Sequence, residues 1–446
     1  MNIPHLLKTL LLGSLLYPTL LQAQNNEATV ETAPDALTLQ ECIDYALQNR
    51  AAVEQAVLDE AIGEREIKAE LAGWLPQVSA GYSGVRNLKL QQQPFGDQVI
   101  TLGRNYTSSI LLQANQTLFS SQLLLASKAA RYTRQQLDLN TINTKINTVV
   151  VVSKAFYDVL LTMEQVRILD ENLVRQEKQY NDARSRFEVG LVDKTDYQRA
   201  AVTLANIRSD RNRAKQAVRA KQAYLKQVMG LPVESEVGLA YDYDAMQQAV
   251  LIDTTEIVEF ANRVELQQLQ VQQQLLQLNT SYQKWGILPT ASAFINYNSL
   301  YFNNELSALY NNAFPTSAVG LQLSLPLFQG GRRYQNLRAA RLEEQRAEVE
   351  AENTRNEINT EYQTALANYK SDYYEWVTLR DNLVVAQEVY DIIQLQYEEG
   401  VKAYIELVVA ETELRATQLN YYNALYNVLS SKLDYQRALG NIDINR

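Results

Sequence analysis

The sequence YNDARSRFEVG at Tyr180–Gly190 returns as YDIIQLQYEEG at Tyr390–Gly400, and the two copies continue without a gap to Gly230 and Gly440. Phe187 aligns with Tyr397, and the identical pairs include Glu188/Glu398, Gly190/Gly400, Ala200/Ala410, Leu204/Leu414, Ala214/Ala424 and Val218/Val428. Solenoid repeats have units of roughly 20–50 residues, so this period is too long for one. The sequence instead predicts two similar halves related by a pseudo-symmetry axis.

The duplication extends towards the N-terminus. Three dipeptides recur in the same order, namely Asn49-Arg50 with Asn262-Arg263, Leu75-Pro76 with Leu288-Pro289, and Leu118-Phe119 with Leu327-Phe328. We therefore expect a first repeat over residues 39–230 and a second over residues 254–440. Residues 24–38 would form an N-terminal segment, residues 231–253 a linker, and residues 441–446 a C-terminal tail.

Residues 1–23 have the pattern of a secretory signal peptide. Lys8 supplies a basic start, residues 10–21 are largely apolar, and Ala23 is a small residue at the expected cleavage point. The alternative, a membrane anchor, is weaker because the apolar run is short and Pro18 interrupts it.

The composition excludes several classes of function. Cys42 is the only cysteine and His5, within the signal peptide, the only histidine, so zinc sites and most nucleophile–base pairs are not expected. We expect no catalytic residue, metal or cofactor. The net charge of -10 argues against a nucleic-acid partner. No stretch after Ala23 approaches the roughly 20 apolar residues of a membrane helix, so any membrane segment should be made of strands.

Two long stretches are rich in helix formers and contain no proline. Each is broken by one glycine, Gly190 or Gly400, which predicts long helices over residues 120–187, 191–229, 332–397 and 401–439. The longer helices would extend about 100 Å at 1.5 Å per residue. Rods of that length must pack side by side as coiled coils.

The stretch before each long helix alternates with period two and predicts a β-hairpin, one over about residues 76–118 and one over about residues 290–327. Each strand has one apolar face and one small or polar face, and polar loops near residues 91–103 and 303–315 join the strands. Aromatic residues sit at the strand ends, as in the girdles of membrane barrels, namely Trp74, Phe119, Trp285 and Phe328. The alternative is a soluble hairpin with one buried face.

Four strands cannot close a barrel in a membrane. The smallest membrane barrels have about eight strands, and an open edge leaves backbone groups unsatisfied in lipid. Several copies must therefore share their hairpins. Two copies would give about eight strands and three about twelve, and the residues alone leave both open.

The order of these elements resembles the TolC family of outer-membrane efflux channels over essentially the whole mature chain. The resemblance implies a mostly α-helical protein with a small β part. Three chains would build a twelve-stranded outer-membrane barrel that continues as an α-helical coiled-coil barrel into the periplasm. The polar strand faces would line a water-filled lumen, the linker would lie at the equator of the tube, and outer-membrane lipid would surround the strands. A periplasmic adaptor and, through it, an inner-membrane pump would be the partners.

The resemblance also assigns roles at the two glycine turns. The tips of the helical hairpins, which would form the closed entrance and contact the adaptor, comprise Gly190, Leu191, Val192, Gly400 and Val401. A latch that holds the entrance shut would use Tyr397, Lys402, Asp196 and Glu406.

The latch departs from the family pattern in two ways. Val409 stands where the family has an aspartate, so an acidic constriction would be weaker or would use Glu406 or Glu398. Lys402 replaces an arginine and cannot grip a carboxylate with a bidentate fork. A pair between Lys402 and Asp196 would be a weak latch, and the alternative is two solvated charges worth about 0–1 kcal/mol.

The leading hypothesis is a passive exit duct for drugs or other solutes, gated at the helix tips. An exit duct of the same fold for type I protein secretion is the alternative within the family. A secreted coiled-coil scaffold would explain the helices but not the two matched hairpins, and an enzyme is disfavoured. The acidic balance of the chain suggests a cation preference in the lumen.

Overall fold

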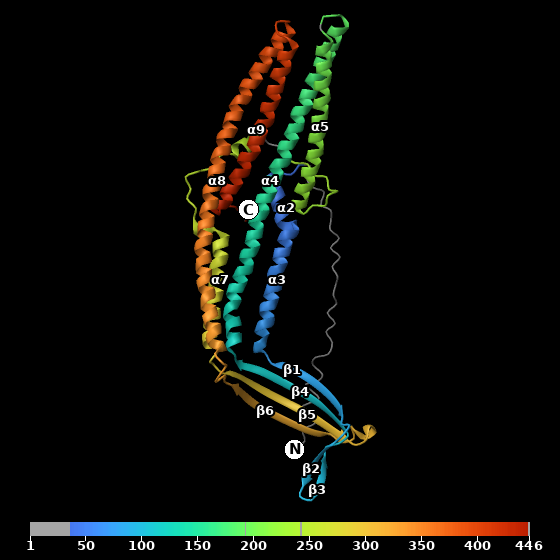
Figure 1. Cartoon of the computed structure of the whole chain (residues 1–446), viewed down its shortest axis with the longest axis vertical. Coiled ribbons are helices and arrows are strands. Elements are labelled where there is room, and N and C mark those ends of the chain that lie inside the picture. The colour runs from blue at the N-terminus through green and yellow to red at the C-terminus, as the bar shows by residue number, and fades with distance from the viewer. Residues whose placement is uncertain (1–35, 192, 241–242, 445–446) are drawn as a thin grey trace.

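The computed structural model describes residues 36–191, 193–240 and 243–444. The predicted signal peptide, most of the predicted N-terminal segment and Val192 lie outside these ranges. The chain is an elongated body of long helices with a curved sheet at one end and two helical tips at the other (Figure 1).

Two helices run nearly the full length of the helical part, α4 (Ser121–Glu188) and α8 (Arg332–Glu398). From the tips, α5 (Lys194–Met229) and α9 (Tyr404–Leu439) return only to mid-height. The lower half is completed by α3 (Ala51–Leu71) and α7 (Val264–Trp285), with α2 (Leu39–Asn49) at mid-height. The shorter helices are η1 (Ala72–Trp74), α6 (Tyr243–Gln248), η2 (Phe260–Asn262) and η3 (Leu306–Ala308).

The short helices of each half meet end to end. Gly230 ends α5 with φ 81°, and a Cβ atom on it would lie 2.3 Å from the backbone oxygen of Asn49, just before α3. Gly440 ends α9 with φ 79°, and a Cβ there would lie 3.1 Å from the backbone oxygen of Asn262, just before α7. The repeated Asn-Arg dipeptides therefore lie against the repeated glycines. Each half thus presents one continuous helix paired with one helix made of two abutting pieces.

Arg263 secures the second junction. Its side chain is only 3% exposed, and its Nη1 donates to the Ala438 carbonyl at 2.9 Å, in the last turn of α9. Its charge is balanced by Glu265 at 3.0 Å and Glu361 at 2.7 Å. In the first half, Arg50 donates to Thr148 Oγ1 at 3.0 Å. A buried arginine that satisfies helix-terminal carbonyls fixes the relative position of the two pieces.

The two predicted hairpins join in one antiparallel sheet of order β1-β4-β5-β6. Its strands are β1 (Gln77–Arg86), β4 (Tyr106–Phe119), β5 (Thr290–Asn303) and β6 (Phe314–Ser324). β1 and β6 are the edge strands, so each has an unpaired row of backbone groups within the chain. The pairing of β4 with β5 joins the two repeats.

The register places apolar residues together on one face of the sheet. The row across the middle reads Val78, Ala114, Ile295 and Val319, and the next row reads Ala80, Leu112, Tyr297 and Ser317. The opposite face carries mainly uncharged polar or small residues, such as Ser79, Gln113, Asn296 and Ala318, although Phe294 and Leu300 of β5 also lie on it. The predicted two-faced strands are present. The side chains of Val78, Leu321 and Val319 are 78–79% exposed, so this face has no cover within the chain.

The predicted polar loop at residues 91–103 is wrong in part. It contains a second hairpin of β2 (Gln91–Phe95) and β3 (Gln98–Leu102) that projects beyond the main sheet (Figure 1). Gly96 at φ 60° makes its two-residue turn possible. Pro94 concealed this strand from pattern analysis, since proline in a run normally argues against a strand.

The main core lies at mid-height, where α4, α9, α8 and the linker meet. Its largest fully buried side chains include Tyr421, Tyr435, Leu160, Leu425 and Leu429. Tyrosine hydroxyls fasten the chain around residues 250–256 to this core. Tyr369 donates to the Val250 carbonyl at 3.0 Å and Tyr362 to the Glu256 carbonyl at 2.8 Å. These bonds satisfy backbone groups of a segment that has no ladder of its own.

One expectation about hydrophobic stretches is wrong. α4 is long and apolar enough to cross a membrane, with an 18-residue window of mean hydropathy 1.4. However, 67% of that window is buried inside the structure. Helix packing accounts for this apolarity, because the core helix of a bundle meets the same test.

The helix junction predicts different costs for two glycine substitutions. Gly190 and Gly230 both have left-handed backbones, at φ 76° and 81°, so alanine costs about 1–2 kcal/mol in strain at either. Only at Gly230 does the new Cβ also collide with backbone, that of Asn49. We expect Gly230→Ala to lower the thermal-unfolding midpoint much more than Gly190→Ala. Equal shifts would show that the two helix pieces are not in close contact.

Candidate functional site

The two helix tips end in the same hydrogen-bonded turn. Gly190 donates to the Phe187 carbonyl at 3.0 Å and Leu191 to the Arg186 carbonyl at 2.8 Å. In the second tip Gly400 donates to Tyr397 at 3.0 Å and Val401 to Gln396 at 2.8 Å. This is the Schellman motif, which needs a left-handed residue and explains both glycines. Leu191 and Val401 are 76% and 73% exposed, so each tip presents an apolar residue to its surroundings.

Just behind the tips, aromatic side chains pack within and between the hairpins. Phe187 stacks on Tyr197 with ring centroids 5.8 Å apart, which holds α4 to α5. Tyr397 and Tyr404 lie 5.9 Å apart and hold α8 to α9. The Arg186 guanidinium lies 5.2 Å from the Tyr397 ring and so joins the two hairpins. A cation over an aromatic face contributes about 0.5–1 kcal/mol at such an exposed place.

A polar seam continues below the tips, where the two hairpins meet. Gln176 donates to the Tyr404 hydroxyl at 3.3 Å, and Lys178 lies 3.6 Å from Glu398. Glu411 has a side chain only 6% exposed and faces Arg175 at 3.8 Å, a distance too long for a hydrogen bond. Among the described residues, Arg175 Nε and Glu411 Oε1 are buried without a hydrogen-bond partner. A buried polar group without a partner costs about 1–3 kcal/mol, so this pair weakens the contact between the two hairpins.

The seam perturbs the acidity of its groups. Burial raises the pKa of the Glu411 carboxyl above 4.5, although a hydrogen bond with Gln179 and the charge of Arg175 oppose the shift. Burial also raises the pKa of Tyr404 to about 12. The pKa of Tyr397 is raised chiefly by burial, with Arg186 opposing and the charges of Asp182 and Asp196 adding to the shift.

The structure places the predicted latch residues near one another but not in the predicted pair. Lys402 forms an ion pair with Glu406, one turn along the start of α9. Asp196 lies in the first turn of α5, close enough to influence Tyr397 and Tyr404. Within the part of the chain that the structure describes, no ion pair joins Lys402 to Asp196. That pairing stays a prediction.

The residues of the seam were not predicted. Glu411 follows Leu407 by four residues and precedes Leu414 by three, so it occupies a position of the apolar stripe on α9. A carboxylate on an apolar stripe is unusual, so the spacing of residues on α9 could have identified Glu411 from the sequence. Arg175 and Gln176 gave no comparable signal, because they become partners of Glu411 and Tyr404 only through the packing of α4 on α9.

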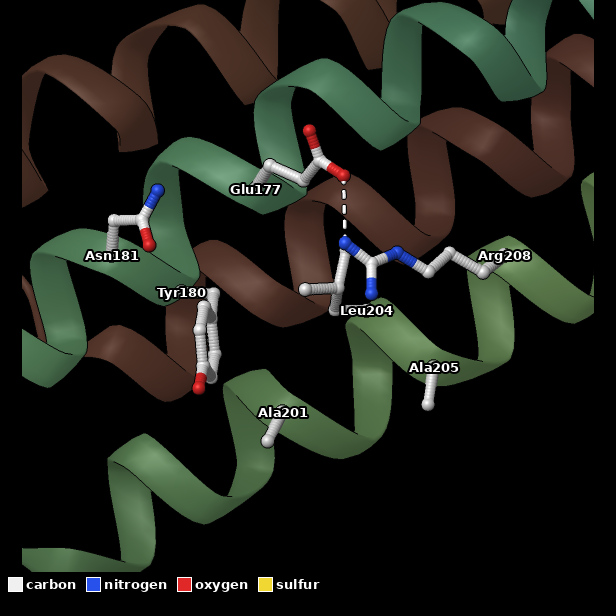
Figure 2. A pocket seen from close by; sticks show the side chains of 7 residues that line it. All are labelled: Glu177, Tyr180, Asn181, Ala201, Leu204, Ala205 and Arg208. Carbon is white, nitrogen blue, oxygen red and sulfur yellow. Dashed lines mark hydrogen bonds and ion pairs between the residues drawn. The ribbon is translucent and has the colours of Figure 1, made fainter.

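Two grooves run along the hairpins near the tips. The groove between α4 and α5 has a volume of about 440 Å³ and is bordered by an ion pair of 2.8 Å between Arg208 and Glu177 (Figure 2). Tyr180 and Leu204 face into it from opposite helices (Figure 2). The groove between α8 and α9, about 270 Å³, is more apolar, with Val389, Ile393 and Val409 among its lining residues.

The described residues contain no group of three or more His, Cys, Asp or Glu side chains that could hold a metal. Cys42 is fully buried, and burial raises the pKa of its thiol to about 12, which makes it a poor nucleophile.

A sheet with one apolar and one polar face, carried on paired helices of about 100 Å, defines a channel-forming protein of the outer membrane. The profile of the family described as "Outer membrane efflux protein" matches residues 42–231 and 259–441. The chain belongs to this family, whose members are transport ducts rather than enzymes. The predicted TolC-family resemblance, the fold class with its two repeats, the outer-membrane location and the role of an efflux exit duct are confirmed.

Known relatives extend over most of the chain. The outer membrane protein TolC of Salmonella enteritidis is 25% identical over 357 residues, which are 75% of this chain and 70% of TolC. The proteases secretion protein PrtF of Dickeya chrysanthemi is 22% identical over 432 residues, 92% of this chain and 89% of PrtF. The CmeC outer membrane channel of Campylobacter jejuni shares the fold with a TM-score of 0.73 at 17% identity, over 92% of this chain and 87% of CmeC.

The buried carboxyl of the seam predicts a pH effect. The raised pKa means that folded Glu411 holds its proton more tightly than unfolded Glu411, so its contribution to stability falls as pH rises from 4.5 through the folded pKa. Glu411→Gln should abolish this contribution. We expect the thermal-unfolding midpoint to differ less between pH 5 and pH 8 in this variant than in the wild type. Glu413→Gln, on the exposed side of α9, is the control and should leave the difference unchanged.

Proposed function

We propose that three copies of the chain form one twelve-stranded barrel and one helical tube. The observation that carries the proposal is the four-stranded sheet with two unpaired edges and an uncovered apolar face. β1 and β6 run in opposite directions, so β6 of one copy can pair antiparallel with β1 of the next and the alternation continues around the ring. Closure satisfies the edge backbone groups that lipid cannot.

The two repeats would contribute structurally similar units, here called staves, to the walls of this assembly. Residues 39–230 and 254–440 each contribute one hairpin to the barrel and one pair of helical rods to the tube, and residues 231–253 wrap the equator of the tube. Three chains then give six near-equivalent staves. The polar faces of the strands would line the water-filled lumen, through which solutes diffuse.

A periplasmic adaptor would dock at the tips and connect the duct to an inner-membrane pump. Helices of such a partner would pack on the exposed Leu191 and Val401 and in the grooves of the two hairpins. Val192, between Leu191 and α5, would belong to the same contact. The gated entrance would lie here, because the seam between the hairpins contains unsatisfied polar groups.

The latch would form between tips in the assembled duct. Lys402 now pairs with Glu406 and is 35% exposed, so its ammonium is free to exchange that carboxylate for Asp196 of a neighbouring tip. Tyr397 would add a hydrogen bond from its hydroxyl to an acidic side chain of a neighbouring tip, besides its ring contact with Arg186. Exposed pairs of this kind are weak, about 0–1 kcal/mol each, which suits a gate that a partner opens.

The cargo would be drugs or other small solutes, in keeping with the family. Export of proteins by a type I secretion system is the second candidate, because PrtF, named for protease secretion, aligns with 92% of this chain.

The barrel proposal predicts a difference between two adjacent residues of β6. Leu321 points to the apolar face, and Gln322 to the opposite face. Lysine on a lipid-facing position costs about 2–4 kcal/mol near the middle of a membrane. Leu321→Lys should therefore abolish heat-modifiable trimers in the outer-membrane fraction, whereas Gln322→Lys should preserve them. Trimers in both variants would contradict the assigned faces, and a dimer in the wild type would contradict the stoichiometry.

The latch proposal predicts larger currents when its residues are replaced. Lys402→Ala removes the exchangeable cation and Tyr397→Phe the tyrosine hydroxyl, so each should raise single-channel conductance in planar bilayers. Lys370→Ala, an exposed lysine of α8 far from the tips, is the control. Unchanged conductance in both tip variants would exclude the latch.

A further inference from the structure

A pocket lies where the second repeat passes from helices to strands, at the opposite end of the helices from the tips (Figure 1). It has a volume of about 450 Å³, and we call it the junction pocket. Its strand residues, Thr290 and Ser324, are register partners at the start of β5 and the end of β6. The next row, Ala291 and Leu323, belongs to the apolar face. Because successive rows point to opposite faces, the junction pocket lies on the polar face of the sheet.

The junction pocket is positively charged. Arg332 and Arg333 line it, and none of its described lining residues is Asp or Glu. Arg333 is held in place because its Nη2 donates to the Lys284 carbonyl at 3.1 Å and its Nε to the Gln283 carbonyl at 3.4 Å. Arg332 is exposed, and among the residues that the structure describes it forms no ion pair. The pocket therefore has one positioned guanidinium and one that is available to a ligand.

The helical spacing of α8 separates Arg332 from the contacts of this helix. Ala347 is 1% exposed, and its carbonyl accepts a hydrogen bond from Gln273 of α7 at 3.2 Å, so this side of α8 packs on α7. Val349 lies on the opposite side and is 68% exposed. At 3.6 residues per turn, Arg332 falls between these two sides, and Arg341, about two and a half turns later, falls on the side away from Arg332. Since Arg332 lines the pocket, it lies on the same side as the polar face of the sheet, and Arg341 lies on the other side.

We propose that the junction pocket binds oxyanion groups of solutes inside the duct, where three copies together form a cationic ring between the barrel and the helical tube. This inference rests on the proposed function, in which the polar face lines the lumen. Arg332 and Arg333 donate to the oxygens of a group such as phosphate, for which the planar guanidinium is well suited. Gln329, Asn336 and the Tyr282 hydroxyl, which also line the pocket, supply further donors. Rings of arginine or lysine favour anions in pores.

This ring opposes the charge of the whole chain. The net charge of -10 favours cations in the lumen on average. The first acidic residue of α8 is Glu343, eleven residues after Arg332, which is about 16 Å along the helix. Charges in water are screened over about 8 Å at physiological salt, so an anion in the pocket interacts with the arginines more strongly than with this carboxylate. The arginines therefore set the local charge at this level of the duct.

The first repeat lacks this site. Aligning Leu118-Phe119 with Leu327-Phe328 places Leu123 and Leu124 opposite Arg332 and Arg333. The Leu123 side chain instead packs against Gly73, where a Cβ atom would lie 2.7 Å from it. The proposal thus gives one anion site per chain rather than one per repeat.

Calorimetric titration of the purified full chain in detergent tests the binding, with inorganic pyrophosphate as the probe. Arg332→Gln should raise the dissociation constant about tenfold, because it removes a charge-assisted hydrogen-bond donor. Arg332→Lys retains the charge but not the fork and should raise the constant by a smaller factor, so it gives a result even if Arg332→Gln fails to assemble. Arg341→Gln is the matched control, since it removes the same charge from the other side of α8, and it should leave the constant unchanged.

Reversal potentials in planar bilayers under a KCl gradient test whether the site faces the lumen. Arg332→Gln should raise the ratio of potassium to chloride permeability, because it removes a positive charge from the wall of the lumen. Arg341→Gln should leave this ratio unchanged. The single-channel currents also show that each variant is folded and assembled.

The proposal would be overturned if the wild type failed to bind pyrophosphate, if Arg332→Gln bound it equally well, or if Arg341→Gln lost as much affinity. Weaker binding in Arg332→Gln with an unchanged permeability ratio would place the site outside the lumen and would also overturn it. The duct itself stands in all these outcomes, since the wild type still conducts. A wild-type protein that forms no channel would contradict the duct and, with it, this inference.

Discussion

The unpaired edges of the four-stranded sheet are the constraint on which the rest of the structure depends. β1 and β6 each present a row of backbone donors and acceptors, and lipid offers no partner for them. The apolar face of the same sheet has no cover within the chain, so water is no better an environment for it. Only pairing with further copies in a closed barrel relieves both conditions. The helices continue from these strands, and the geometry of the barrel therefore sets the arrangement of the tube.

Because the chain contains two copies of one unit, the barrel and the helical tube can both be built from repeated elements. Each repeat supplies a hairpin, a long continuous helix and a second helix assembled from two pieces, and the same glycine lies against the same Asn-Arg dipeptide in both halves. The halves differ where function would require it. The tips contain different charges around Gly190 and Gly400, and the start of α8 has Arg332 and Arg333 where the start of α4 has Leu123 and Leu124. The two repeats therefore share one backbone geometry and differ in the side chains at its two ends.

Much of the fold was predictable because the signals are periodic and local. Long proline-free stretches with one glycine each predicted the four major helices, and period-two alternation predicted the four strands of the main sheet. The hairpin of β2 and β3 was missed because proline in a short polar run argues against a strand. The apolar window of α4 was underestimated because a buried core helix and a membrane helix share one composition. At the candidate site, the glycine turns were predictable from sequence, whereas the seam of Arg175 and Glu411 was not.

The sequence alone established the duplication, the helix and strand types, the glycine turns and the resemblance to an outer-membrane family, because each follows from the order and spacing of residues along one segment. Only the tertiary structure showed that Lys402 pairs with Glu406, that Glu411 is buried opposite Arg175, and that Arg333 donates to carbonyls at the end of α7. Some of these contacts join segments that are more than two hundred residues apart, such as Arg175 and Glu411. In others, such as that of Lys402, one of several nearby carboxylates becomes the partner. Such choices depend on how the helices pack, and packing is not encoded in any single stretch.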